Sequence, residues 1–199
     1  MRTVTPHRHL LTAAAALAAA ALLAVPSAAS AAPAPPAAAS TALYPVAALA
    51  AERLATADLV AAAKWGTEGP IDDPAREQQV LDSAAAQAQQ AGADPDEVRR
   101  IFRDQIEANK LVQRGLFKRW TAHPSEAPTT KPDLNLVRQR INRITTDLVQ
   151  ALAVSTPERA VPSCRPELAL AVVRVGYESH PDLLHTTALV RSLPSVCRG

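Results

Sequence analysis

The sequence DPDEVRRIFRDQIEANKLVQRGLFKRW, residues 94–120, establishes the helical character of this chain. It opens with Asp94 and Pro95, an acidic residue that can cap a helix and a proline suited to the first helical turn. Further along, Ile106 and Phe117 belong to a mainly apolar row on one helical face. We therefore expect one long helix that ends at about Trp120.

The rest of the chain also favours helices, because β-branched alternation is nearly absent and prolines separate stretches rich in Ala, Leu, Val, Arg and Glu. Asp72-Asp73-Pro74 and Asp133 predict two further helix starts. The expected helices cover residues 46–68, 74–91 and 95–120, a segment starting at 134, and two shorter segments at 167–176 and 181–193, with a connector at 121–131. We predict an all-α chain, a single helical-bundle domain with a C-terminal helical lobe.

The N-terminus has the pattern of a secretory signal peptide. Arg2 and Arg8 precede an uninterrupted run of apolar and small residues at 10–25, and Ala29-Ser30-Ala31 offers a cleavage site. The run is short for a membrane span, although an uncleaved anchor is the alternative interpretation. We expect cleavage near Ala31 and a secreted or periplasmic protein, in which residues 32–45 form an extended Ala/Pro-rich tether.

The charge balance argues against a nucleic-acid or membrane-surface partner. The first 31 residues hold two of the 21 basic residues and none of the 19 acidic ones, so the remainder carries 19 of each. A chain with no net charge lacks the basic excess that binding to phosphate backbones or anionic lipids requires. We expect no nucleic-acid partner and no membrane association after processing.

Two cysteines, Cys164 and Cys197, both lie in the part expected to be exported. An oxidising compartment favours their one possible disulfide over two free thiols, and it would staple the last two helices. A closed loop of this length contributes about 3–4 kcal/mol in the chain-entropy model. A zinc site would need more ligands at closer spacing, so no metal is expected.

Several polar residues stand at positions that helices are expected to bury. Arg53 and Lys64 are three helical turns apart and point the same way, and Lys64 interrupts the apolar stretch 59–65. Each residue alone could be a snorkelling base or part of a solvated face. Together they predict an interior pocket for a small dicarboxylate. The set is Arg53, Lys64, Asp73, Arg76, Glu77, Asn109, Gln113 and Arg138.

The pattern Arg53-x10-Lys64-x8-Asp73-x2-Arg76-Glu77, followed by Gln105-Ile106-x-Ala108-Asn109-Lys110-x2-Gln113, resembles the all-helical chorismate mutases. The signal peptide and the cysteine pair are similar to those of their exported class. The resemblance implies a mutase domain over residues 46–199, with catalytic helices at 46–154 and a C-terminal lobe at 155–199. It also implies a homodimer that converts chorismate to prephenate by a cofactor-free [3,3] rearrangement.

The resemblance further implies a role for each residue of the set. Lys64 and Gln113 would donate hydrogen bonds to the ether oxygen of chorismate. The arginines would bind its carboxylates, with Arg53 also assisting at the ether oxygen. Asp73 and Glu77 would meet the ring hydroxyl, and Asn109 would be a supporting polar contact. Gln113 departs from family members that have a carboxylic acid there, and Arg140 and Arg143 are alternatives to Arg138.

Two other functions fit the same residues. One is an isochorismate pyruvate lyase, which has the same fold and a similar set of cations. The other is a secreted, non-catalytic helical module that binds small anions or a protein. Hydrolase, dinucleotide and metalloenzyme interpretations lack support, because the sequence contains no G-x-S-x-G, G-x-G-x-x-G, H-E-x-x-H or C-x-x-C motif.

Overall fold

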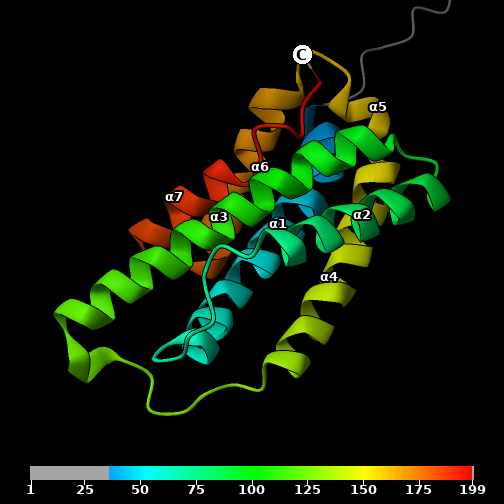
Figure 1. Cartoon of the computed structure of the whole chain (residues 1–199). Coiled ribbons are helices and arrows are strands. Elements are labelled where there is room, and N and C mark those ends of the chain that lie inside the picture. Colours follow the sequence, from blue (N-terminus) through cyan, green and yellow to red (C-terminus); the bar gives the residue numbers. More distant parts are fainter. Residues whose placement is uncertain (1–35, 199) are drawn as a thin grey trace, which may run out of the picture. The chain divides into compact units, whose positions relative to one another are not determined.

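The computed structural model describes residues 36–198, and this part of the chain is helical with no strand. None of the helices in this part is both long enough and apolar enough to cross a membrane. The prediction of an all-α fold is confirmed (Figure 1). The elements are α1 (Pro36–Lys64), α2 (Pro74–Gln90), α3 (Pro95–Ala122), the 3-10 turn η1 (Pro124–Glu126), α4 (Leu134–Val154), α5 (Thr156–Arg159), α6 (Cys164–Ser179) and α7 (Leu183–Arg191).

Aspartates begin the helices as the sequence predicts. The carboxylate of Asp73 accepts a hydrogen bond from the backbone N–H of Arg76 at 3.0 Å, and Asp94 and Asp133 cap α3 and α4 in the same way. Each carboxylate satisfies an N–H group that has no partner within its own helix. Asp182 caps α7 through the N–H of His185, a cap that the sequence analysis did not identify.

The first helix differs from the prediction at both ends. It begins at Pro36 and ends at Lys64, so the extended tether expected over residues 32–45 is wrong for residues 36–45. Leu43 and Val46 are fully buried, and burial of their side chains stabilises the helical form of an alanine-rich segment that already favours it. The predicted signal peptide and residues 32–35 lie outside the described residues.

α1 occupies the centre of the bundle, where it packs against α3, α4 and α6 (Figure 1). α7 packs mainly on α3, and a β-carbon added to Gly115 of α3 would lie 2.6 Å from Leu184. The glycine therefore permits the close approach of these two helices. Buried side chains of α6 and α7, including Val175 and Leu189, join the same apolar cluster as those of α1 and α3.

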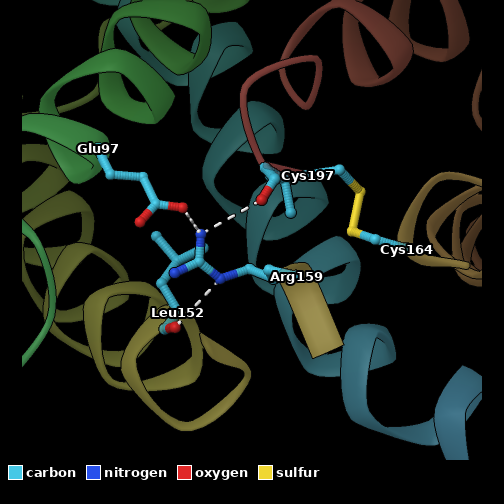
Figure 2. Close-up of a disulfide and its surroundings, with 6 residues drawn as sticks. Glu97, Leu152, Arg159, Cys164 and Cys197 are labelled. Carbon is cyan, nitrogen blue, oxygen red and sulfur yellow. Dashed lines mark hydrogen bonds and ion pairs between the residues drawn. A yellow bond between two sulfur atoms is a disulfide. The ribbon is translucent and has the colours of Figure 1, made fainter. Parts of the chain in front are cut away.

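The C-terminus is fastened by a disulfide and by a buried ion cluster. Cys164 and Cys197 are bonded, with 5.7 Å between their Cα atoms, which confirms the predicted pair. Beside it, the guanidinium of Arg159 donates to Glu97 and to the carbonyl oxygens of Leu152 and Val196 (Figure 2). α5, which the sequence analysis missed, positions Arg159 for these contacts.

Candidate functional site

A pocket with a cavity volume of about 120 Å³ lies among α1, α2, α3 and α4. All eight residues of the predicted set line it, although they come from four helices and the loop between α1 and α2. The structure thus brings together Arg53, Lys64, Asp73, Arg76, Glu77, Asn109, Gln113 and Arg138.

Arg53 is a buried cation with no carboxylate partner. Its residue surface is 4% exposed, its Nε is buried without a hydrogen-bond partner, and no described residue forms an ion pair with it. Its guanidinium carbon lies 5.4 Å from the centre of the Phe102 ring. Burial lowers the pKa of Arg53 to about 10, so the group remains charged at neutral pH. A charge in this setting favours the binding of an anion.

Lys64 is the last residue of α1 and faces the loop that leads to α2. Its Nζ donates to the carbonyl oxygen of Pro70 at 2.6 Å, which uses one of its three donors. Burial lowers the pKa of Lys64, and the positive charge of Arg138 acts in the same direction, while Asp73 raises the pKa. Because Pro70 takes only one of its three donors, the Lys64 ammonium keeps the others for a ligand in the pocket.

Glu77 is held by two cations that the sequence analysis did not assign to the site. Its Oε1 lies 3.1 Å from Lys110 Nζ, and its Oε2 lies 3.3 Å from Arg103 Nη1. Lys110 also contacts Asp72 at 3.2 Å and Glu107 at 2.7 Å. Burial opposes the charge on Lys110, but the three carboxylates outweigh it and raise its pKa. Lys110 and Arg103 therefore hold the Glu77 carboxylate in place.

The sequence indicates where Lys110 lies on its helix, but it does not indicate the partners of Lys110. Lys110 follows Ile106 by one helical turn and thus lies near the predicted apolar row. Glu77, by contrast, is 33 residues away on another helix. Other lining residues, mostly apolar, were also not assigned to the site: Thr56, Val60, Ile71, Val80, Ile106, Leu134 and Ile141.

The amides of Asn109 and Gln113 form a pair one turn apart on α3. Gln113 Nε2 donates to Asn109 Oδ1 at 2.7 Å. Gln113 is 4% exposed, and its Oε1 is buried without a hydrogen-bond partner. The pair contributes neutral polar groups to a pocket wall that otherwise carries charges and apolar side chains.

Among the three candidate arginines of α4, Arg138 lines the pocket. Arg140 instead faces Glu52, with 3.5 Å between its Nη2 and the carboxylate, and Arg143 is exposed. From α2, Arg76 adds a further guanidinium, whose Nη1 donates to Gln79 at 3.1 Å.

The lining can therefore bind a small molecule with two carboxylates. Five cationic side chains line the cavity, and two carboxylates, two amides and the Thr56 hydroxyl complete its polar lining. Within residues 36–198, no three His, Cys, Asp or Glu side chains gather closely enough to hold a metal ion. Fold and pocket together define an all-helical protein with a compact anion-binding site.

Comparisons with known proteins identify the family. Residues 46–114 match the model of chorismate mutase type II. The chain is 38% identical over 156 residues to a secreted chorismate mutase of Mycolicibacterium smegmatis, which covers 78% of this chain and 86% of that protein. It is 34% identical to one of Mycobacterium tuberculosis over 75% of each chain. The chain belongs to the chorismate mutase type II family.

The fold agrees with that assignment. The crystal structure of a chorismate mutase from Burkholderia phymatum superposes with a TM-score of 0.76 at 35% identity, and covers 81% of this chain and 99% of that one. The similarity extends well beyond the matched family segment, and thus includes the region that follows α3.

Proposed function

We propose that this protein is an exported chorismate mutase, which converts chorismate to prephenate without a cofactor. The observation that carries the proposal is the convergence of five cations and the Gln113 amide on one pocket in which Arg53 has no carboxylate partner. A protein that buries an uncompensated charge loses stability unless a ligand supplies the counter-charge, and chorismate carries two carboxylates.

The arginines select the reactive shape of the substrate. Arg53, Arg76 and Arg138 approach the cavity from α1, α2 and α4, so they can grip both carboxylates from different sides. Chorismate reacts only when its enolpyruvyl arm folds over the ring. Holding that conformer lowers the entropic part of the barrier, which can amount to several kcal/mol.

Lys64 and Gln113 act on the bond that breaks. In the rearrangement the ether C–O bond breaks while a C–C bond forms between the arm and the ring, and negative charge grows on the ether oxygen. Donors fixed at that oxygen bind the transition state more tightly than the substrate. Glu77, oriented by Lys110, accepts a hydrogen bond from the ring hydroxyl, and Asp73 contacts the same group.

The names of the relatives support export, since the mycobacterial proteins are both described as secreted. We assign residues 1–31 to a cleaved signal peptide and residues 46–199 to the mutase domain. We also propose that the protein forms a homodimer, in which each subunit builds its own pocket.

The test is an assay of the purified protein with chorismate, following loss of substrate and appearance of prephenate. Lys64→Ala should lower kcat about 10²–10³-fold, the usual cost of removing a transition-state donor. Lys118→Ala is the matched control, because Lys118 is exposed on α3 outside the pocket. Circular dichroism should show the same helical content in all three proteins.

Two results would replace the proposal with its alternatives. Release of pyruvate and salicylate from isochorismate, with no prephenate from chorismate, would identify a pyruvate lyase. Binding of a dicarboxylate analogue without turnover of either substrate would identify a binding module. A Lys64→Ala variant that keeps more than about a tenth of the wild-type kcat would show that Lys64 is not the main donor to the ether oxygen.

A further inference from the structure

The amide pair on α3 leaves one polar atom unsatisfied. Gln113 Nε2 donates to Asn109 Oδ1 at 2.7 Å, while Gln113 Oε1 is buried and has no hydrogen-bond partner. A buried acceptor without a partner destabilises the arrangement that contains it. This arrangement is one of two that the pair can adopt, and in it the amide oxygen of Gln113 has no partner.

Half-turns of both amide groups give the other arrangement. Asn109 Nδ2 then donates to Gln113 Oε1, which satisfies the buried oxygen and frees Gln113 Nε2. Each side-chain amide has one acceptor oxygen and one NH₂ donor, so the exchange preserves the hydrogen bond between them. The difference lies in what Gln113 offers to the pocket, which is an acceptor in the first arrangement and a donor in the second.

The chemistry of the substrate selects between them. An ether oxygen has lone pairs and no proton, and it gains negative charge as the C–O bond breaks. A Gln113 oxygen near it would repel that charge, whereas the NH₂ group would stabilise it. Asn109 can support the second arrangement because its own NH₂ group can become the donor.

We propose that Asn109 is a positioning residue, which turns the Gln113 amide so that its NH₂ group faces the ether oxygen of bound chorismate. This inference rests on the proposed mutase function. It assigns Asn109 a role through Gln113 instead of a direct contact with the substrate. Substitutions at 109 should therefore act on kcat and leave KM nearly unchanged.

Asn109→Asp gives a sharp test, because an ionised carboxylate only accepts hydrogen bonds. It would hold Gln113 Nε2 on itself and leave the Gln113 oxygen for the substrate. We expect kcat to fall about 10²-fold near neutral pH, the lower end of the cost of losing one donor. Acidification should restore kcat, since the introduced carboxyl group, once protonated, can donate to Gln113 Oε1.

Other charged groups of the pocket also affect a pH profile. They are Arg53 and Lys64 on α1, Arg76 and Glu77 on α2 with Asp73 at its cap, Lys110 on α3, and Arg138 on α4. The wild-type protein and Asn109→Ser contain all of them. Because a serine hydroxyl can both donate and accept, Asn109→Ser should keep kcat within about fivefold of wild type and show no acid recovery.

A double-mutant cycle separates positioning from direct binding. Gln113→Ala should lower kcat about 10²-fold, and Asn109→Ala should lower it by a smaller factor in the wild-type background. In the Gln113→Ala background, Asn109→Ala should have no further effect on kcat, because the residue it positions is absent.

The proposal is overturned if the two alanine substitutions multiply, or if Asn109→Asp raises KM at unchanged kcat, which would indicate a direct substrate contact. A Gln113→Ala variant with wild-type kcat would also overturn it while leaving the mutase activity intact. Failure of the wild-type protein to form prephenate would instead refute the proposed function itself. Thermal melting of each variant shows whether the helical bundle is preserved.

Discussion

Two buried arginines of this protein have opposite surroundings. Arg159 is fully buried and donates to Glu97 (Figure 2). Glu97 also accepts from Arg198 Nε at 2.8 Å. Burial opposes the charge of Glu97, but hydrogen bonds from Arg198 and the charge of Arg159 outweigh it and lower the carboxyl pKa. Arg53 is almost as buried, yet its Nε has no hydrogen-bond partner and no described carboxylate forms an ion pair with it.

The contrast separates structural from functional charge in one helical bundle. A buried cation compensated by a carboxylate of the same chain holds elements together, here α3, α5 and the C-terminus. A buried cation without such a partner lowers stability and is retained for binding. Substitution of each type should therefore affect a different property.

The largest expected effect is on stability, at Arg159. Arg159→Ala leaves Glu97 without the partner that is fully buried with it, and breaking a buried pair costs about 3–5 kcal/mol in the free energy of unfolding. The kcat of the folded fraction should stay at the wild-type value. Chemical denaturation and a steady-state assay measure the two quantities.

Arg53→Met is the matched variant on the other side of the comparison. It should abolish most of the activity without lowering the free energy of unfolding, because it removes a desolvated charge that has no carboxylate partner. Equal destabilisation by Arg53→Met and Arg159→Ala would contradict the distinction between a structural and a functional arginine.

The disulfide comes next and belongs to the structural side. Its reduction frees a loop with a sequence separation of 33 residues. The loss should be about 3–4 kcal/mol, which lowers Tm by roughly 10 °C in a domain of this size. At 25 °C kcat should not change. If the double variant Cys164→Ala/Cys197→Ala also has a lower kcat at a temperature well below its Tm, the disulfide affects the pocket as well as the stability.

A smaller effect is expected at Arg138, whose side chain is partly exposed at the pocket. Arg138→Ala should raise KM about 30-fold, which corresponds to the loss of about 2 kcal/mol for an unpaired carboxylate. Arg140→Ala removes a surface pair with Glu52 and should change KM less than about twofold. A larger rise of KM in Arg140→Ala than in Arg138→Ala would assign the carboxylate contact to Arg140.

The smallest effect concerns His185, a paired cation outside the pocket. Its hydrogen bond with Asp58 and a second one with Asp182 raise its pKa to about 9, although burial opposes the charge. Because the folded pKa exceeds the unfolded value of about 6.5, the stabilisation is complete below pH 6.5 and declines as the pH rises through 9. His185→Gln should flatten this part of the stability curve, with no change in kcat.

Local signals explain what the sequence predicted correctly. Asp73, Asp94 and Asp133 start helices through contacts with residues two or three positions away. Spacing within one helix likewise placed Arg53 and Lys64 on the same wall of the pocket. Such arguments need only the geometry of a single helix.

Contacts between distant segments explain the omissions. Glu97 meets Arg159 across 62 residues and Arg198 across 101, and no local pattern links them. The tether prediction failed for a related reason. Composition suggested an extended chain, but the burial of Leu43 within the bundle stabilises a helix there.

The origin of the pocket lining has a consequence for how activity depends on protein concentration. All eight residues of the predicted set, Arg138 among them, line a pocket within one polypeptide. A pocket that takes its predicted binding residues from one polypeptide does not need a partner subunit to supply them. We therefore predict that specific activity stays constant as the protein is diluted from micromolar to picomolar concentrations, which an assay over serial dilutions measures.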